Sequence, residues 1–205
     1  MVKANGPRTG AERIRGINRK LLSDQWARVE SVSFEYQHSD GSWQKQEREI
    51  YHRGHGSAIL LYNLERRTVV LVRQFRFPAF DAGDDGFMLE VPAGIIETDD
   101  PENTIRKETE EETGFLIDNP QFLFRAYSTP GSVTEQVHYF CAAYHPENRS
   151  GEGGGLVSEG EDIEVIEVDL GEALAWIDNG MIIDAKTIIL IQYASVNLFA
   201  DAGSV

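Results

Sequence analysis

The pattern of apolar and polar residues predicts a chain built mainly of short β-strands. Apolar and polar residues alternate along 28–36, the pair Asp40-Gly41 is typical of a hairpin turn, and residues 43–51 predict the returning strand. Further along the chain, short runs rich in Val, Ile, Leu and Phe predict more strands. These runs cover residues 57–62, 68–73, 87–91, 122–127, 137–143 and 163–168.

Start and stop signals predict three helices. The first covers residues 101–113. The second covers 171–179 and stops before Gly180, and the third covers about 185–199 after a capping Asp184. Strands that alternate with helices in this way indicate an α/β fold.

Two segments lack such a pattern. Residues 1–20 are polar and contain six Lys or Arg, so we expect a basic flexible arm there, with a short helix near residues 11–22. Residues 145–161 form a long loop that contains three consecutive glycines at 153–155. A loop of that length is either functional or disordered.

The amino-acid composition disfavours several classes of function. The chain has 205 residues, with 34 Asp plus Glu against 19 Lys plus Arg and a net charge of −15, which disfavours a nucleic-acid polymer as partner. The lone Cys141 excludes an internal disulfide framework. No apolar run approaches the roughly 18 residues of a membrane helix, and no apolar stretch follows the basic N-terminus. We therefore expect a soluble cytoplasmic protein with no membrane partner.

Candidate chemistry is concentrated in the helix 101–113. Asp100 is a good N-cap, Pro101 suits the first helical position, and Gly114 suits the left-handed residue past the end. Three carboxylates then share one face of the helix: Glu108, Glu111 and Glu112. Like charges one turn apart are unfavourable, and so are anions at a helix C-terminus. A hard divalent cation such as Mg²⁺ or Mn²⁺ would reverse both effects.

The alternative for this stretch is a solvated acidic face. It predicts Lys or Arg at i±4 that neutralise the carboxylates. Arg106 and Lys107 are expected to point elsewhere on the helical wheel, since neither lies three or four residues from Glu112. The spacing weakens this alternative without excluding it.

The same stretch resembles the Nudix box, G-x5-E-x7-R-E-U-x-E-E-x-G-U, in which U is apolar. The matching residues are Gly94, Glu108, Glu111, Glu112, Gly114 and Phe115. Three residues depart from the box: Asp100 replaces the first Glu, Lys107 replaces the Arg, and Thr109 replaces an apolar residue. In addition, the segment between Asp100 and Lys107 is one residue shorter than in the box. The carboxylates are intact, but Arg106 or Lys107 must supply the orienting salt bridge of the box.

The shortened box resembles one group of the Nudix family, the GDP-mannose pyrophosphatases of the NudK type. Collinear segments carry the resemblance from about Leu21 to Tyr193: LVRQFR at 71–76, PAG at 92–94, PENTIRKE at 101–108, PGSVTE at 130–135, GGG at 153–155, EDIEV at 161–165 and DAKT at 184–187. The resemblance implies the Nudix α/β/α sandwich, with a mixed β-sheet and an N-terminal β-hairpin extension. It implies a dimerisation hairpin at 21–56, which crosses to the partner and completes the substrate site, and a Nudix hydrolase domain at 57–205.

The resemblance also implies a metal site and a base. The implied ligands of Mg²⁺, or alternatively Mn²⁺, are the carbonyl of Ala93 and the carboxylates of Glu108, Glu112 and Glu161. Glu159, on the loop after the strand 137–143, resembles the usual catalytic base, with Glu111 and Glu112 as further catalytic carboxylates. The roles of Glu159 and Glu161 could be exchanged, and Glu112 could instead activate the water. Without the resemblance, Ala93 is a plain loop residue and the loop acids are solvated.

Four residues resemble substrate contacts of the group: Trp26, Arg76, Glu135 and Lys186. Arg48 is a weaker candidate for contact with the diphosphate. Arg76 ends a predicted strand and Lys186 begins the last helix, and both would meet the diphosphate, where a helix N-terminus adds backbone donors. Glu135 would accept hydrogen bonds from sugar hydroxyls or guanine, and Trp26 would stack on the base. Core packing is the alternative for Trp26, and a surface or ion-pair role is the alternative for Arg48.

The implied reaction is Mg²⁺-dependent hydrolysis of a small-molecule nucleotide sugar by a homodimer, with GDP-mannose giving GMP and mannose 1-phosphate. The nearer alternative is ADP-ribose or another nucleoside diphosphate sugar, because Pro130 lies 15 residues beyond Phe115, a spacing that resembles the ADP-ribose pyrophosphatases. The distant alternative is a Nudix module that binds nucleotide or metal without turnover. Its support is limited to the departures at Asp100, Lys107 and Thr109.

Overall fold

The computed structural model describes residues 9–97 and 100–200, which form two compact units. The first unit contains the segment up to Gly54 together with Tyr127–Glu135. The second contains His55–Ala126 together with the chain from Gln136 onward. Each unit has its own sheet and is described by itself.

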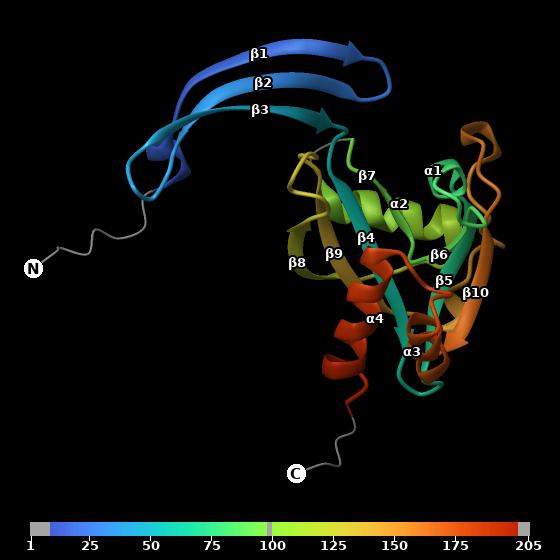
Figure 1. Cartoon of the computed structure of the whole chain (residues 1–205). Coiled ribbons are helices and arrows are strands. Elements are labelled where there is room, and N and C mark those ends of the chain that lie inside the picture. The colour runs from blue at the N-terminus through green and yellow to red at the C-terminus, as the bar shows by residue number, and fades with distance from the viewer. Residues whose placement is uncertain (1–8, 98–99, 201–205) are drawn as a thin grey trace, which may run out of the picture. The chain divides into compact units, whose positions relative to one another are not determined.

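An antiparallel sheet of three strands, in the order β1-β2-β3, forms most of the first unit (Figure 1). Its elements are η1 (Gly10–Arg13, a 3-10 helix), β1 (Ile14–Asp24), β2 (Arg28–Gln37) and β3 (Trp43–His52). The hairpin predicted from 28–36 and 43–51 is confirmed. The Asp40 carboxylate accepts a hydrogen bond from Ser42 N at 2.9 Å, which explains why Asp40-Gly41 makes the turn.

The short helix expected near residues 11–22 is wrong, because most of this segment is strand β1. β1 pairs with β2 along its length, with a register shift between Arg15 and Asn18. Gly16 lies in this shift with a left-handed φ of 64°. An interior glycine weakens a helix by about 1 kcal/mol, whereas it suits a β-bulge. Pairing with β2 therefore outweighs the local helix propensity of the segment.

The flexible arm expected at residues 1–20 is wrong for its second half, because residues 10–20 form η1 and the first part of β1. An ion pair of 2.7 Å joins Arg15 of β1 to Glu35 of β2 and helps to fix this strand. Residues 1–8 lie outside the described residues.

A mixed sheet of seven strands forms the centre of the second unit (Figure 1). The order is β10-β5-β4-β9-β8, and in addition β6 pairs with β5 and β7 pairs with β4. The β4–β9 pair is parallel, whereas β4–β5, β4–β7, β5–β6 and β5–β10 are antiparallel. The strands are β4 (Gly56–Asn63), β5 (Thr68–Phe75), β6 (Phe87–Glu90), β7 (Ala93–Ile95), β8 (Gln121–Tyr127), β9 (Gln136–Ala143) and β10 (Glu164–Asp169).

Helices cover both faces of this sheet (Figure 1). They are α2 (Pro101–Thr113), α3 (Leu170–Asp178) and α4 (Ala185–Asn197). Successive residues of β4 point to opposite faces. Ala58 and Leu60 belong to the core cluster that contains residues of α3 and α4, and Ile59 and Leu61 belong to the cluster that contains Ile105 of α2. The α/β/α sandwich with a mixed sheet is confirmed.

The strands and helices predicted for the second unit are confirmed to within two residues at each end. Two elements were not predicted: α1 (Phe77–Asp81) and β7, which have five and three residues and are too short to show a periodic pattern. The loop 145–161 contains the 3-10 turns η2 (Pro146–Asn148) and η3 (Val157–Glu159). No helix among the described residues is long and apolar enough to cross a membrane.

Candidate active site

Helix α2 carries the acidic residues, and its two ends form as the sequence predicts. The Asp100 carboxylate accepts a hydrogen bond from Asn103 N at 3.0 Å, and Pro101 lies in the first turn. Gly114 ends the helix with a left-handed φ of 74°. These ends fix the helix so that Glu108, Glu111 and Glu112 lie in its C-terminal half.

Glu112 connects α2 to the sheet. It is buried, with 2% of its surface exposed, and its Oε2 accepts a hydrogen bond from Ala93 N at 3.2 Å. Ala93 is the first residue of β7. The family resemblance implies that Ala93 and Glu112 belong to one metal site, and the structure brings these two residues together.

Gly94 allows Glu108 to lie directly against the backbone of β7. A Cβ at Gly94 would stand 2.1 Å from Oε1 of Glu108, closer than any real contact. Any larger residue at position 94 would therefore have to displace the Glu108 side chain.

Burial and neighbouring carboxylates raise the pKa of two residues of this face, Glu108 and Glu112. Burial, followed by the charge of Glu111, raises the pKa of Glu108 from 4.5 to about 7. Burial and then the charge of Glu108 raise the pKa of Glu112 well above its ordinary value. Ionised carboxylates held in this way are unfavourable until positive charge is placed among them.

The glycine-rich loop packs against the C-terminal end of α2. Gly154 N donates to Glu112 O at 2.9 Å, and Gly155 N donates to Glu111 O at 3.0 Å. These bonds satisfy carbonyl groups that the end of a helix leaves unpaired. A Cβ at Gly155 would stand 2.5 Å from Oε2 of Glu161, so the glycine also leaves room for that carboxylate.

The two loop acids differ in their surroundings. Glu161 is partly buried, and its Oε2 accepts a hydrogen bond from Leu156 N at 2.8 Å. Glu159 is exposed in η3. The charges of both raise the pKa of Glu108, so both lie within electrostatic reach of it. In the described part of the chain, no three His, Cys, Asp or Glu side chains are gathered into a ready-made metal cage.

Lys107 supplies an ion pair on the acidic face. Its Nζ lies 3.3 Å from Oε2 of Glu111, one turn along the helix. Arg106 turns away, donating to Ile117 O at 2.6 Å and to Glu102 at 2.8 Å. The expectation that both cations point away from the acidic face is therefore wrong for Lys107, because it lies four residues before Glu111.

Arg76 and Lys186 meet at a buried carboxylate that was not predicted from the sequence. Glu90, at the end of β6 and 3% exposed, accepts hydrogen bonds from Arg76 Nε at 2.7 Å and Nη2 at 3.0 Å, and another from Lys186 Nζ. Burial alone would raise the pKa of Glu90, but these two cations outweigh it and hold the pKa below its ordinary value. The signal was a charged residue inside an apolar strand, because a buried charge requires partners.

Arg76 and Lys186, which we call the basic pair, lie near the acidic face of Glu108, Glu111 and Glu112. The charge of Arg76 acts on Glu112 and opposes the rise in its pKa. Lys186 lies in the first turn of α4, and its Nζ is 3.1 Å from Asp184 Oδ2. The predicted cap of α4 is confirmed, since the Asp184 carboxylate accepts a hydrogen bond from Thr187 N at 3.0 Å.

Two of the predicted substrate contacts, Trp26 and Glu135, share a partner in the first unit. Trp26 is 77% exposed, which excludes core packing within this unit, and the Arg53 guanidinium lies 5.3 Å from its ring centre. Arg53 also pairs with Glu135 at 3.3 Å, and Glu135 accepts a hydrogen bond from Ser128 Oγ at 2.7 Å. Arg53 was not among the predicted residues.

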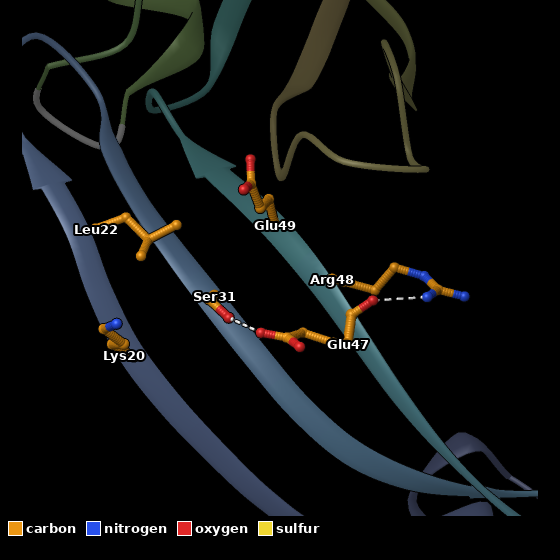
Figure 2. A pocket seen from close by; sticks show the side chains of 6 residues that line it. All are labelled: Lys20, Leu22, Ser31, Glu47, Arg48 and Glu49. Atoms are coloured by element: carbon orange, nitrogen blue, oxygen red, sulfur yellow. Dashed lines mark hydrogen bonds between the residues drawn. The ribbon is translucent and has the colours of Figure 1, made fainter.

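Arg48 lies on β3 of the first unit. It borders a shallow depression lined by Lys20, Leu22, Ser31, Glu47, Arg48 and Glu49 (Figure 2). Its guanidinium donates to Glu47 O at 2.7 Å and to Gln46 Oε1 at 2.9 Å. Figure 2 shows Glu47 turned toward Ser31, while Arg48 extends from the other side of the strand. The substrate role of Arg48 stays a prediction.

A solved structure described as an ADP compounds hydrolase has the same fold. Its TM-score is 0.69, and the similarity covers 90% of this chain and 96% of that chain. The sequences are only 18% identical, so the likeness concerns the fold alone.

Known sequences are similar over both units. Residues 13–51 match the family model of the GDP-mannose pyrophosphatase NudK N-terminal domain, and residues 52–188 match the NUDIX domain. A GDP-mannose pyrophosphatase of Yersinia pestis (strain Pestoides F) is 44% identical over 188 residues, which cover 91% of this chain and 94% of that protein. One of Pectobacterium atrosepticum is 44% identical over 181 residues, covering 88% and 93%. This chain therefore belongs to the NUDIX family of hydrolases, which act on pyrophosphate bonds.

Proposed function

We propose that this protein is a Mg²⁺-dependent hydrolase that converts GDP-mannose to GMP and mannose 1-phosphate. The observation that carries the proposal is the acidic face formed by the partly buried Glu108 and the buried Glu112, beside the basic pair of Arg76 and Lys186. The names of the relatives at 44% identity support the choice of substrate.

The oxygen donors of the site fit Mg²⁺, a hard cation, with Mn²⁺ as the alternative. The residues that would hold it are Ala93, through its carbonyl, and Glu108, Glu112 and Glu161, through their carboxylates. The raised pKa values of Glu108 and Glu112 support this choice, because a cation would stabilise their ionised forms. When bound, Mg²⁺ would stabilise the negative charge that develops on the phosphoryl oxygens.

The chain's own groups would then bind the diphosphate and move a proton. Arg76 and Lys186 would supply fixed positive charge to the phosphates. Glu159 would accept the proton of the attacking water while a bond forms from the water oxygen to phosphorus and the bridging P–O bond breaks. Its exposure supports this role, because Glu112 and Glu161 already accept backbone hydrogen bonds. Glu111 would hold Lys107 on the acidic face.

The first unit would recognise the rest of the substrate. Trp26 would stack on guanine, Glu135 would accept hydrogen bonds from guanine or the sugar, and Arg48 would assist with phosphate. We propose a homodimer as the working form, supported by exposed apolar side chains on β1: Ile17, Leu21 and Leu22. The single cysteine, Cys141, is compatible with action in the cytoplasm, a reducing compartment.

Trp26→Ala is expected to raise KM for GDP-mannose by about tenfold and to leave kcat nearly unchanged, since stacking of one base contributes about 1–3 kcal/mol. Steady-state kinetics over a range of substrate concentrations measures both constants. Trp43→Ala is the matched control, because Trp43 also lies under an arginine, with Arg15 at 3.9 Å, in the same sheet. An unchanged KM in Trp26→Ala would refute the stacking role.

Gly94→Ala is expected to fold and to lose about 10–100-fold in kcat/KM, a typical result when the support of a metal ligand is disturbed. The added Cβ meets both the carboxylate and the Cγ of Glu108, so this side chain must rotate away while the backbone can stay in place. Gly151→Ala is the matched control, since a Cβ there meets no atom within 4 Å. Equal activity of the two variants would contradict the importance of this close approach.

A substrate panel tests the proposed function. GDP-mannose, ADP-ribose and other nucleoside diphosphate sugars are compared by kcat/KM at equal Mg²⁺ concentration. We expect GDP-mannose to give the highest value. A higher value for ADP-ribose would favour the nearer alternative, and no Mg²⁺-dependent release of a nucleoside monophosphate from any substrate would favour a binding module.

A further inference from the structure

We infer that Glu90 is a positioning residue, which holds Arg76 and Lys186 together as one phosphate-binding pair. The inference rests on the function proposed above. Its first support is geometric: the Glu90 carboxylate accepts two hydrogen bonds from Arg76 and one from Lys186. The two cations come from different elements, since Arg76 precedes α1 and Lys186 lies in the first turn of α4.

Glu90, Arg76 and Lys186 differ in how far their side chains are exposed to solvent. The Glu90 side chain is 4% exposed, whereas Arg76 is 44% and Lys186 is 19% exposed. The carboxylate is therefore out of reach of a ligand, and the cations are not. A guanidinium has five N–H donors and Glu90 engages two of them, so the group retains donors for phosphate oxygens.

The positive charges of Arg76 and Lys186 explain why they need a shared counter-charge such as Glu90. Arg76 and Lys186 repel each other, and both have long side chains that can swing into water. Glu90 supplies a shared counter-charge that holds both cations before a substrate arrives, so less rotamer freedom is lost on binding. Asp184, 3.1 Å from Lys186, adds a second negative charge and leaves the four groups together neutral.

Backbone contacts support the same arrangement without the ion pair. Thr187 Oγ1 accepts a hydrogen bond from Val91 N at 2.8 Å and donates one to Asp184 Oδ2 at 2.6 Å. Val91 follows Glu90, and Thr187 follows Lys186. The first turn of α4 is therefore tied to the end of β6 independently of Glu90, and a neutral residue at position 90 should leave the fold intact.

The test compares Glu90→Gln, Glu90→Asp and Glu167→Gln. Glu167→Gln is the matched control, because Glu167 pairs with Arg66 at 2.7 Å in the same unit and belongs to no part of the site. We expect Glu90→Gln to lower kcat for GDP-mannose by about 10–100-fold, as the loss of a supporting carboxylate typically does. Glu90→Asp keeps the charge on a shorter side chain and should recover part of this loss. Glu167→Gln should match the wild type.

A second readout does not depend on turnover. The Arg76 Nε–H signal is followed by ¹H–¹⁵N NMR during titration with GDP in the absence of metal. In the wild type we expect a hydrogen-bonded signal that shifts on GDP binding, and in Glu90→Gln we expect both features to be lost. If the wild type fails to hydrolyse GDP-mannose but these signals behave as expected, the proposed function fails and the positioning role stands.

A purely structural role for Glu90 gives a different result. In that case Glu90→Gln lowers the thermal midpoint, while kcat and the GDP-induced shift of Arg76 equal those of the wild type, which overturns the inference. If Glu90→Gln does not fold, Glu90→Asp decides. Wild-type kcat and an unchanged Arg76 shift in that variant would likewise overturn it.

Discussion

Glu112→Gln is expected to lower kcat for GDP-mannose by about 10³-fold, because several kcal/mol of transition-state stabilisation depend on the cation that this carboxylate would hold. The variant should fold, since Gln keeps an oxygen that can accept the hydrogen bond from Ala93 N. The measurement is kcat at saturating Mg²⁺. Glu110→Gln is the control, because Glu110 is an exposed residue of the same helix. Wild-type kcat in Glu112→Gln would remove this residue from the mechanism.

The same substitution should stabilise the protein when metal is absent. The pKa of Glu108 is raised to about 7 and that of Glu112 lies well above its ordinary value, so the folded state binds more protons than the unfolded chain above pH 4.5. The stability that this protonation gives is complete below pH 4.5 and is lost as the pH rises through about 7.

Thermal midpoints measured with EDTA test this linkage. From about pH 5 to about pH 8, the wild-type midpoint should fall more steeply than that of Glu112→Gln, which has one fewer carboxylate to ionise. At the higher pH, Mg²⁺ should raise the wild-type midpoint and have little effect on the variant. A steeper fall in the variant would contradict the position assigned to Glu112.

Arg76→Ala is expected to lower kcat/KM by about 10²–10³-fold, the usual cost of removing one preorganised donor from developing negative charge. It also leaves the buried Glu90 with Lys186 as its remaining cationic contact, so the thermal midpoint should fall. Steady-state kinetics and thermal unfolding measure the two effects separately.

Arg66→Ala provides the comparison for Arg76. Arg66 pairs with Glu167, but 51% of its side chain is exposed, and a surface ion pair contributes about 0–1 kcal/mol. The control should retain both its kcat/KM and its midpoint. If Arg76→Ala lowers the midpoint and leaves kcat/KM unchanged, Arg76 supports the fold and does not bind the diphosphate.

Local signals were sufficient to predict helix α2. Its start at Pro101 and its end before Gly114 follow from capping chemistry that involves only neighbouring residues. The strands β4 and β5 were predictable for a similar reason, because each is a short, continuous apolar run that is buried on both faces of the sheet.

β1 and the contact between α4 and β6 depend on distant partners, and the sequence does not predict them. β1 is almost entirely exposed, so no buried apolar face marks it in the sequence, and it becomes a strand because β2 supplies its hydrogen bonds. The sequence predicts the capping of α4 by Asp184, but it does not predict the contact of Lys186 in α4 with Glu90 in β6. That contact joins residues 96 positions apart, Glu90 and Lys186, and no local pattern reports such a pairing.

In the candidate site, too, some features follow from local sequence and others depend on contacts between distant residues. The spacing of the carboxylates on α2 follows from helical geometry, and the family resemblance added Ala93, which the structure places against Glu112. The position of Glu108 against Gly94 explains why a glycine suits this position, and that contact depends on the folded structure. The roles of Glu159, Glu161, Trp26, Arg48 and Glu135 in binding and catalysis stay predictions.

Product analysis with GDP-mannose during a Mg²⁺ titration tests the proposed reaction most directly. The purified protein is treated with EDTA, Mg²⁺ is added back stepwise, and the products are separated and quantified. We expect no turnover without metal, and equal amounts of GMP and mannose 1-phosphate in proportion to the Mg²⁺ bound. Unchanged GDP-mannose at saturating Mg²⁺ and Mn²⁺, or its cleavage to GDP and free mannose, would contradict the proposed hydrolysis of the pyrophosphate bond.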